Sequence, residues 1–183
     1  MPTVPHGDAM RETMRNLRQA RQFTPEAVTE DEIQELVEVA RWSGSARNKQ
    51  PWHFIVVDDR AILQKISEAR PNVTWVADAP LAIVIVLDGE NTIFEAYDEG
   101  RVTERILLAA RSLGLSGGTA WFHEADTTAD IRDMLGVPES AVVRQAVVIG
   151  HPITHTDHRP NANTPGRKPA EEVISRNRVG TPL

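Results

Sequence analysis

The chain has 183 residues, of which 40% are hydrophobic and 25% are charged, and it contains no cysteine. This length favours a single domain with a sizeable core, and the missing cysteine excludes disulfides, thiolate metal sites and a cysteine nucleophile. The net charge of −6 argues against nucleic acid and anionic membranes as partners, because both bind basic surfaces.

No segment of the sequence is expected to span or anchor in a membrane. The longest apolar run covers residues 81–87, far fewer than the ~20 residues that a transmembrane helix needs. The N-terminal residues lack the apolar stretch of a secretory signal. We therefore expect a cytoplasmic protein.

The first part of the chain is predicted to pass from a loose leader into a strong helix. Residues 1–14 are assigned to the leader, although a helix over residues 9–19 could begin inside it. Thr29 and Glu32 form the spacing of a capping box, which predicts a helix start. Apolar residues then recur at helical spacing, and this helix is expected to end before Gly44.

Four later stretches rich in β-branched or small apolar residues are predicted to be strands. The stretch at 81–87 is apolar at every position, which indicates a central strand covered on both faces. The four predicted strands cover residues 53–57, 81–87, 115–121 and 142–150.

Three further helices are predicted between these strands. Asp58 or Asp59 would cap the first of them. The second, over residues 98–113, is followed by Gly114 at the position of a left-handed C-cap. The third would begin at Asp126 and end before Gly136.

Alternation of strands and helices, taken alone, favours a parallel sheet, whereas the motifs described below favour a mixed one. Residues 15–150 are assigned to one domain. Residues 151–183 are polar and interrupted by prolines, and we expect them to form an arm that becomes ordered against another surface.

The loop before residue 53 contains Ser45, Asn48 and Gln50, braced by Pro51. Their donors and acceptors suit the polar edge of a planar heterocycle, although composition alone also fits an ordinary polar loop.

Two arginines three residues apart, Arg18 and Arg21, could converge on a phosphate through charge-assisted hydrogen bonds, or form a solvated basic face. Arg167 in the C-terminal arm is a third candidate cation.

Two other patterns are weaker. Three histidines and Asp157 have a spacing that suggests a metal site, but their proline-rich surroundings argue against one, and no metal ligand is assigned. Gly117 and Gly118 lack the spacing of a dinucleotide-binding loop. The three histidines are His151, His155 and His158.

Taken together, these stretches resemble the flavin-dependent nitroreductase family, of which the chain would be a short, divergent member. The order and rough spacing of the motifs match over residues 15–173, and the Asn-x-Gln-Pro-Trp part of the loop is the most specific. The matching stretches are RQARQF at 18–23, SGSARNKQPW at 43–52, LGLSGG at 113–118 and RKPAEE at 167–172.

The resemblance implies an α+β fold, a three-layer sandwich whose central sheet is mixed, mostly antiparallel and flanked by helices. It also implies a homodimer with one FMN in each of two interface sites. The implied activity is that of an FMN-dependent NAD(P)H oxidoreductase. Hydride would pass in ping-pong order through flavin N5 to a small organic acceptor such as a nitroaromatic compound or a quinone, without a catalytic side chain.

Residue by residue, the resemblance assigns the FMN phosphate to the three arginines and the polar atoms of the ring or ribityl chain to the loop side chains. Backbone groups after the second long helix would line the ring near N5. The cofactor-binding residues implied in this way are Arg18, Gln19, Arg21, Ser45, Asn48, Gln50, Gly118, Thr119, Ala120, Trp121 and Arg167.

The chain departs from the family pattern at several positions. Gln19 replaces a usual serine and Gly44 a usual proline, and Trp121 and Phe122 stand where a small or acidic residue is common. Bulky rings there would narrow the acceptor pocket or stack on what enters it. The alternative function is a flavin- or deazaflavin-binding protein that sequesters the cofactor with little turnover, and a third is a flavin enzyme that fragments or dehalogenates a small substrate.

Overall fold

The computed structural model describes residues 7–122, 128–153 and 166–183. Four strands form one sheet in the order β1-β2-β4-β3, and each neighbouring pair is antiparallel. The described strands therefore do not form the parallel sheet that alternation alone favours. The strands are β1 (Trp52–Val57), β2 (Leu81–Leu87), β3 (Ser116–Trp121) and β4 (Val142–Gly150).

The central strand β2 has every residue buried, as its all-apolar sequence predicts. Successive side chains of a strand point to opposite faces. Accordingly, Leu81, Ile83 and Ile85 belong to one apolar cluster, whereas Ala82 and Val84 belong to another. The sheet thus separates two cores.

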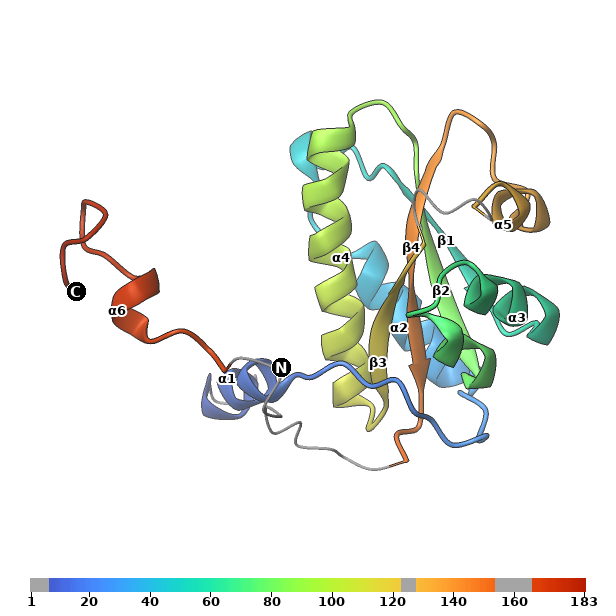
Figure 1. The fold of residues 1–183 in the computed structure, drawn as a ribbon, viewed down its shortest axis with the longest axis horizontal. Helices are drawn as coiled ribbons and strands as arrows, with labels where there is room; N and C mark the ends of the chain where they lie inside the picture. The colour runs from blue at the N-terminus through green and yellow to red at the C-terminus, as the bar shows by residue number, and fades with distance from the viewer. Residues whose placement is uncertain (1–6, 123–127, 154–165) are drawn as a thin grey trace, which may run out of the picture.

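Helices cover both faces of the sheet, so the expected three-layer α+β sandwich is confirmed (Figure 1). One core contains Leu36 and Ala40 from α2 and Val102 and Ile106 from α4. The covering elements of this face are α2 (Glu30–Arg41) and α4 (Thr92–Ser112), and those of the other face are α3 (Arg60–Glu68), the short 3₁₀ helix η2 (Thr74–Asp78) and α5 (Thr128–Leu135).

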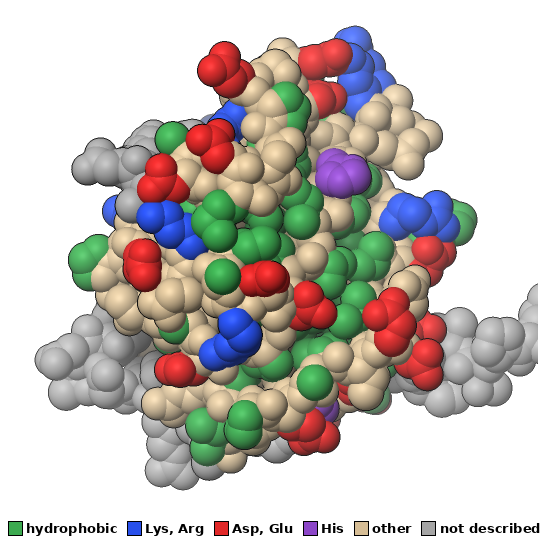
Figure 2. Space-filling view, turned by 90° about the vertical axis from the view of Figure 1, so that its right-hand side faces the viewer, with side chains coloured by type: hydrophobic (Ala, Val, Ile, Leu, Met, Phe, Trp, Pro, Cys, Tyr) green, Lys and Arg blue, Asp and Glu red, His purple; other side chains and the backbone are tan. Residues whose placement is uncertain are grey.

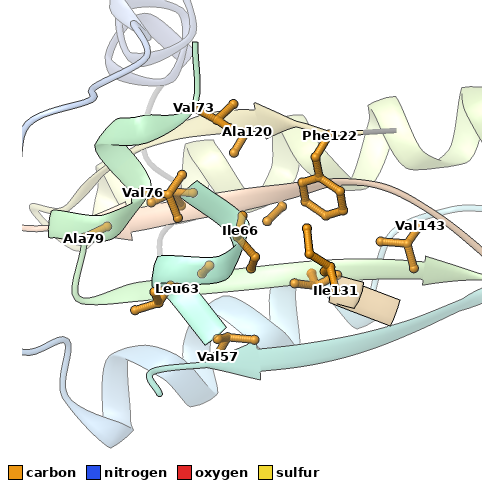
Figure 3. Packing of buried hydrophobic residues seen from close by; sticks show 14 of the residues in the cluster. Val57, Leu63, Ile66, Val73, Val76, Ala79, Ala120, Phe122, Ile131 and Val143 are labelled. Atoms are coloured by element: carbon orange, nitrogen blue, oxygen red, sulfur yellow. The ribbon is translucent and has the colours of Figure 1, made fainter. Parts of the chain in front are cut away.

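The second core is filled from several elements at once. Figure 3 shows Leu63 and Ile66 of α3, Val76 of η2, Ile131 of α5 and Phe122 on the same side of the sheet. All five side chains are fully buried. None of the described helices combines the length and the apolar character needed to cross a bilayer.

Local capping signals are confirmed where the sequence predicts them. The Thr29 hydroxyl accepts from the Glu32 amide at 3.3 Å, and the Glu32 carboxylate accepts from the Thr29 amide at 2.8 Å. Asp59, not Asp58, caps α3 by accepting from the two amides that follow residue 60. Gly114 adopts the left-handed conformation with φ +80° just after α4.

Helix α4 begins six residues before the predicted start at 98. The Asn91 side chain caps it by accepting from the Phe94 amide at 3.1 Å. At the start of α4 the usual burial of apolar residues is reversed, because Phe94 and Tyr97 are exposed while the acidic Glu95 and Asp98 are buried. A periodicity search for an apolar buried face therefore misses this part of the helix.

The ends of the chain differ from the expectation in detail. Helix α1 (Gly7–Asn16) occupies most of the expected leader and ends earlier than predicted. Residues 166–183 are exposed, contain the short α6 (Ala170–Val173) and extend away from the sheet (Figure 1). The predicted cap at Asp126 lies outside the described residues.

The two aromatic residues after β3 have different environments. Phe122 is fully buried in the second core, whereas Trp121 is 43% exposed. The expectation that both rings narrow a pocket is therefore wrong for Phe122. Of the two rings, Trp121 is the exposed one.

Candidate functional site

The segment that carries the N-terminal arginines lies along the open edge of the sheet. Strand β3 is an edge strand, and the Ala20 amide donates to the Gly117 carbonyl at 2.8 Å. The Gln19 side chain bridges Thr119, since its Nε2 donates to Thr119 Oγ1 at 3.1 Å and its Oε1 accepts from the Thr119 amide at 3.3 Å. We call Gln19, Ala20, Arg21, Gly118 and Thr119 the β3-edge cluster.

Position 118 requires a glycine because the segment around Ala20 lies so close to β3. A Cβ atom at Gly118 would lie 2.5 Å from the Ala20 carbonyl oxygen and 3.2 Å from the Trp75 ring. Because carbon and oxygen atoms do not approach to 2.5 Å without a bond, any side chain there would push the N-terminal segment off β3.

Arg21 is held by an aromatic face. Its guanidinium carbon lies 5.9 Å from the centroid of the Trp75 ring, which also contacts Phe23 at 6.3 Å between centroids. An exposed cation–π contact of this kind contributes about 0.5–1 kcal/mol. Arg21 is exposed, and none of the described carboxylates pairs with it. Its charge is therefore available to an anion.

The other two candidate arginines are not directed at Arg21. Arg18 donates through Nη1 to the carbonyls of Arg15 and Leu17, both at 2.7 Å, at the end of α1. Arg167 lies in the exposed C-terminal segment and has no ion pair within the described ranges. Convergence of the three arginines on one phosphate stays a prediction.

Residues 44–50 form a second cluster, which we call the 44–50 loop. Arg47, Asn48 and Gln50 all have left-handed backbone, with φ of 54°, 55° and 51°. Such conformations cost roughly 1–2 kcal/mol for residues other than glycine and asparagine, and they concentrate at functional sites.

The three loop residues predicted from the sequence differ in their contacts. The Ser45 hydroxyl closes the loop by accepting from the Gln50 amide at 2.8 Å. Asn48 and Gln50 are exposed, and the only hydrogen bond of the Gln50 side chain within the described chain goes to the Asn48 carbonyl at 3.4 Å. Both amide side chains can therefore meet a polar ligand.

The β3-edge cluster and the 44–50 loop lie toward opposite ends of the sheet. The loop precedes Trp52, which pairs with Leu87 at the carboxyl end of β2. Gly117 is level with Leu81 at the amino end of β2, since both pair with the same residue of β4. One chain therefore does not combine the two clusters into a single cleft.

A hollow of about 470 Å³ lies between β1 and the end of α5 and reaches Gln50 and Pro51. Figure 2 shows the face with α3 and α5, where hydrophobic side chains are visible between charged ones. The lining of this hollow includes neither arginine nor lysine. It therefore does not suit a phosphate.

The inner side of α4 carries acids that the sequence analysis missed, because acids on a helix usually face solvent. Glu95 is 2% exposed and accepts from the Asn91 amide at 2.7 Å. Burial raises the pKa of Glu95 against the lowering effect of that amide, and the neighbouring Asp88 carboxyl raises it further. Glu99 is also buried, and it pairs with Arg144 at 2.9 Å.

The weak metal hypothesis gains no support. Within the described ranges, no group of three histidine, aspartate or glutamate side chains is arranged to hold a metal ion. His151 lies 4.0 Å from the Glu26 carboxylate. The other members of the predicted group, His155, Asp157 and His158, lie outside the described residues.

Comparisons with known proteins agree with the motifs. The family model described as the nitroreductase family matches residues 14–86. A protein of Archaeoglobus fulgidus named for NADH dehydrogenase and NAD(P)H nitroreductase is 35% identical over 147 residues, which cover 76% of this chain and 83% of that protein. FMN reductase (NAD(P)H) of Bacillus subtilis is 24% identical over 175 residues, which cover 82% of this chain and 70% of that protein. The structure of B. megaterium NfrA2 matches with a TM-score of 0.81 and 26% identity, over 92% of this chain and 74% of that one.

Gly118→Ala should destabilise the protein by about 1–3 kcal/mol, because the new methyl group overlaps the Ala20 carbonyl. Urea unfolding without cofactor measures this. The matched control is Gly100→Ala inside α4, where no described atom other than the helix's own neighbouring backbone lies within 4 Å of the new atom. Alanine there should stabilise the helix by roughly 0.5–1 kcal/mol. Equal effects of the two changes would contradict the close approach.

Glu95→Gln should raise the Tm at pH 8. The raised pKa of Glu95 means that stability from its protonated form is complete below the ordinary value of 4.5 and is lost as pH rises through the folded-state value. Glutamine has no charge to bury, so the advantage should shrink toward pH 4.5. Glu104→Gln on the exposed side of α4 is the control. A Tm difference that is the same at both pH values would contradict the assignment.

Proposed function

Because this chain belongs to the nitroreductase family, we propose that it works as an FMN-dependent NAD(P)H oxidoreductase. The electrons would go to a small organic acceptor such as a nitroaromatic compound or a quinone. Support for FMN and a nicotinamide substrate comes from the relatives named for NAD(P)H nitroreductase and FMN reductase activities. The observation that carries the proposal is the β3-edge cluster, where an available guanidinium lies next to an obligatory glycine.

The residues present fit FMN by the chemistry of their donors. A phosphate dianion needs a cation that is not already neutralised, and Arg21 meets this requirement. The polar edge of the flavin ring needs neutral donors and acceptors, which the exposed Asn48 and Gln50 amides provide. Gly118 allows the segment that carries Arg21 to lie against β3.

Bound FMN would supply the redox chemistry by accepting a hydride from NAD(P)H and passing electrons to the acceptor. The chain would bind, orient and screen. Arg21 would hold the phosphate, Asn48 and Gln50 would orient the ring edge, and the half-exposed Trp121 would limit the size of the acceptor. The proposed reaction requires no side chain as general acid or base.

The proposed site requires two chains. Since the two clusters lie toward opposite ends of one sheet, we propose that the β3-edge cluster of one chain meets the 44–50 loop of a partner in a homodimer. The exposed apolar residues Ile93, Phe94 and Tyr97 at the start of α4 supply surface that a partner would cover. The C-terminal arm would bring Arg167 to the same interface.

Arg21→Ala should weaken FMN binding by about 1.5–3 kcal/mol, the contribution of a charged hydrogen bond, while leaving riboflavin binding unchanged because riboflavin has no phosphate. Quenching of flavin fluorescence measures both affinities. Arg18→Ala and Arg167→Ala undergo the same test, and Arg70→Ala, an exposed arginine in the turn after α3, is the control.

Equal losses for FMN and riboflavin would mean that Arg21 does not hold the phosphate. A wild-type protein that is colourless and gains neither flavin absorbance nor thermal stability with FMN would refute the proposed function itself.

A further inference from the structure

Three polar side chains of α4 contact the backbone at the start of the 44–50 loop and just before it. The Asp98 carboxylate accepts from the Ala46 amide at 3.1 Å. Arg101 Nη1 donates to the Gly44 carbonyl at 2.6 Å. One turn further, Arg105 Nη1 donates to the Trp42 carbonyl at 3.1 Å.

The spacing of these contacts follows from the two backbones. Asp98, Arg101 and Arg105 are at i, i+3 and i+7, so they share one face of the helix. The steps of three and four helical residues rise about 4.5 and 6 Å, and two residues of extended chain cover roughly 6.6 Å. Successive contacts on α4 therefore meet alternate residues 46, 44 and 42 of a segment that runs in the opposite direction.

Asp98 is the buried member of this group. It is 3% exposed, and its neighbouring cation is Arg101, with 3.5 Å between Nη1 and the carboxylate. A buried carboxylate that accepts from an amide makes a strong, directional hydrogen bond. The position of Ala46 at the start of the strained backbone is thus fixed by a group that cannot easily move.

The same contacts account for Gly44, which replaces a proline of the family pattern. A Cβ atom at Gly44 would lie 3.2 Å from Arg101 Nη1, so a larger residue would make the guanidinium shift by a few tenths of an ångström relative to the carbonyl. A proline would restrain this backbone covalently. Here the restraint comes from Arg101 across 57 residues of sequence.

We propose that Asp98 and Arg101 are positioning residues for the flavin site. They hold the 44–50 loop in the left-handed conformation that presents Asn48 and Gln50 to the cofactor. This inference rests on the proposed function. It adds that hydrogen bonds from α4, rather than a proline, restrain the backbone of the 44–50 loop.

The test compares Arg101→Met and Asp98→Ala with wild type and with Glu104→Ala, the same kind of truncation on the exposed side of the same helix. Amide hydrogen exchange without flavin should become roughly tenfold faster in residues 43–50 and stay unchanged in β4. FMN affinity should fall roughly tenfold, a loss of about 1.4 kcal/mol. Arg101→Lys retains a donor and should restore most of both.

A second pair of variants isolates the contact at Gly44. Gly44→Ala alone should cause part of the loss of FMN affinity that Arg101→Met causes. Combined with Arg101→Met it should cause no further loss, because the guanidinium that the new methyl group would shift is already absent. Additive losses would overturn the link between these two residues.

The outcomes separate this inference from the proposed function. Unchanged amide hydrogen exchange in residues 43–50 would overturn the restraint of the loop by α4, whether or not FMN binds. Faster exchange with unchanged FMN affinity overturns the positioning role. If wild type does not bind FMN, the proposed function fails, and the positioning role fails with it.

Discussion

The seven apolar residues of β2 must be shielded from water on both faces of the sheet, and the rest of the structure depends on this requirement. Burial of a strand on both sides demands a helical layer above and below it. Helices α2 and α4 cover one side, and α3, η2 and α5 cover the other. With both faces closed, polar groups that bind ligands are confined to the sheet edges and to the loops at its two ends.

The candidate site follows from this confinement. The open edge of β3 is covered by the segment around Gln19, which places a guanidinium over Trp75 and requires glycine at 118. The loop before β1 lies toward the opposite end, where α4 holds its backbone. The inward acids at the start of α4 face that loop and the turn after β2, so helix α4 serves both the core and the proposed site.

The sequence predicts the features that depend on neighbours in the chain. The all-apolar run of β2, the Thr29 capping box and the left-handed Gly114 are each encoded within a few residues, and all are confirmed. Strand direction is not encoded locally, so alternation alone pointed to a parallel sheet. The contact of Gln19 with Thr119 joins residues 100 positions apart, and only the folded chain shows it. The start of α4 was missed because Glu95 and Asp98 face inward while Phe94 faces out.

The most direct test of the account is complementation between two defective chains, Arg21→Ala and Asn48→Ala, each of which should lose most FMN-dependent NAD(P)H oxidation as a pure protein. After the two are mixed and their subunits exchange, one site of each hybrid dimer would combine an intact Arg21 with an intact Asn48. Random exchange then predicts recovery of about a quarter of wild-type activity, since half of the dimers are hybrids and half of their sites are intact. Activity that stays at the mean of the two parents would contradict a flavin site shared between two chains.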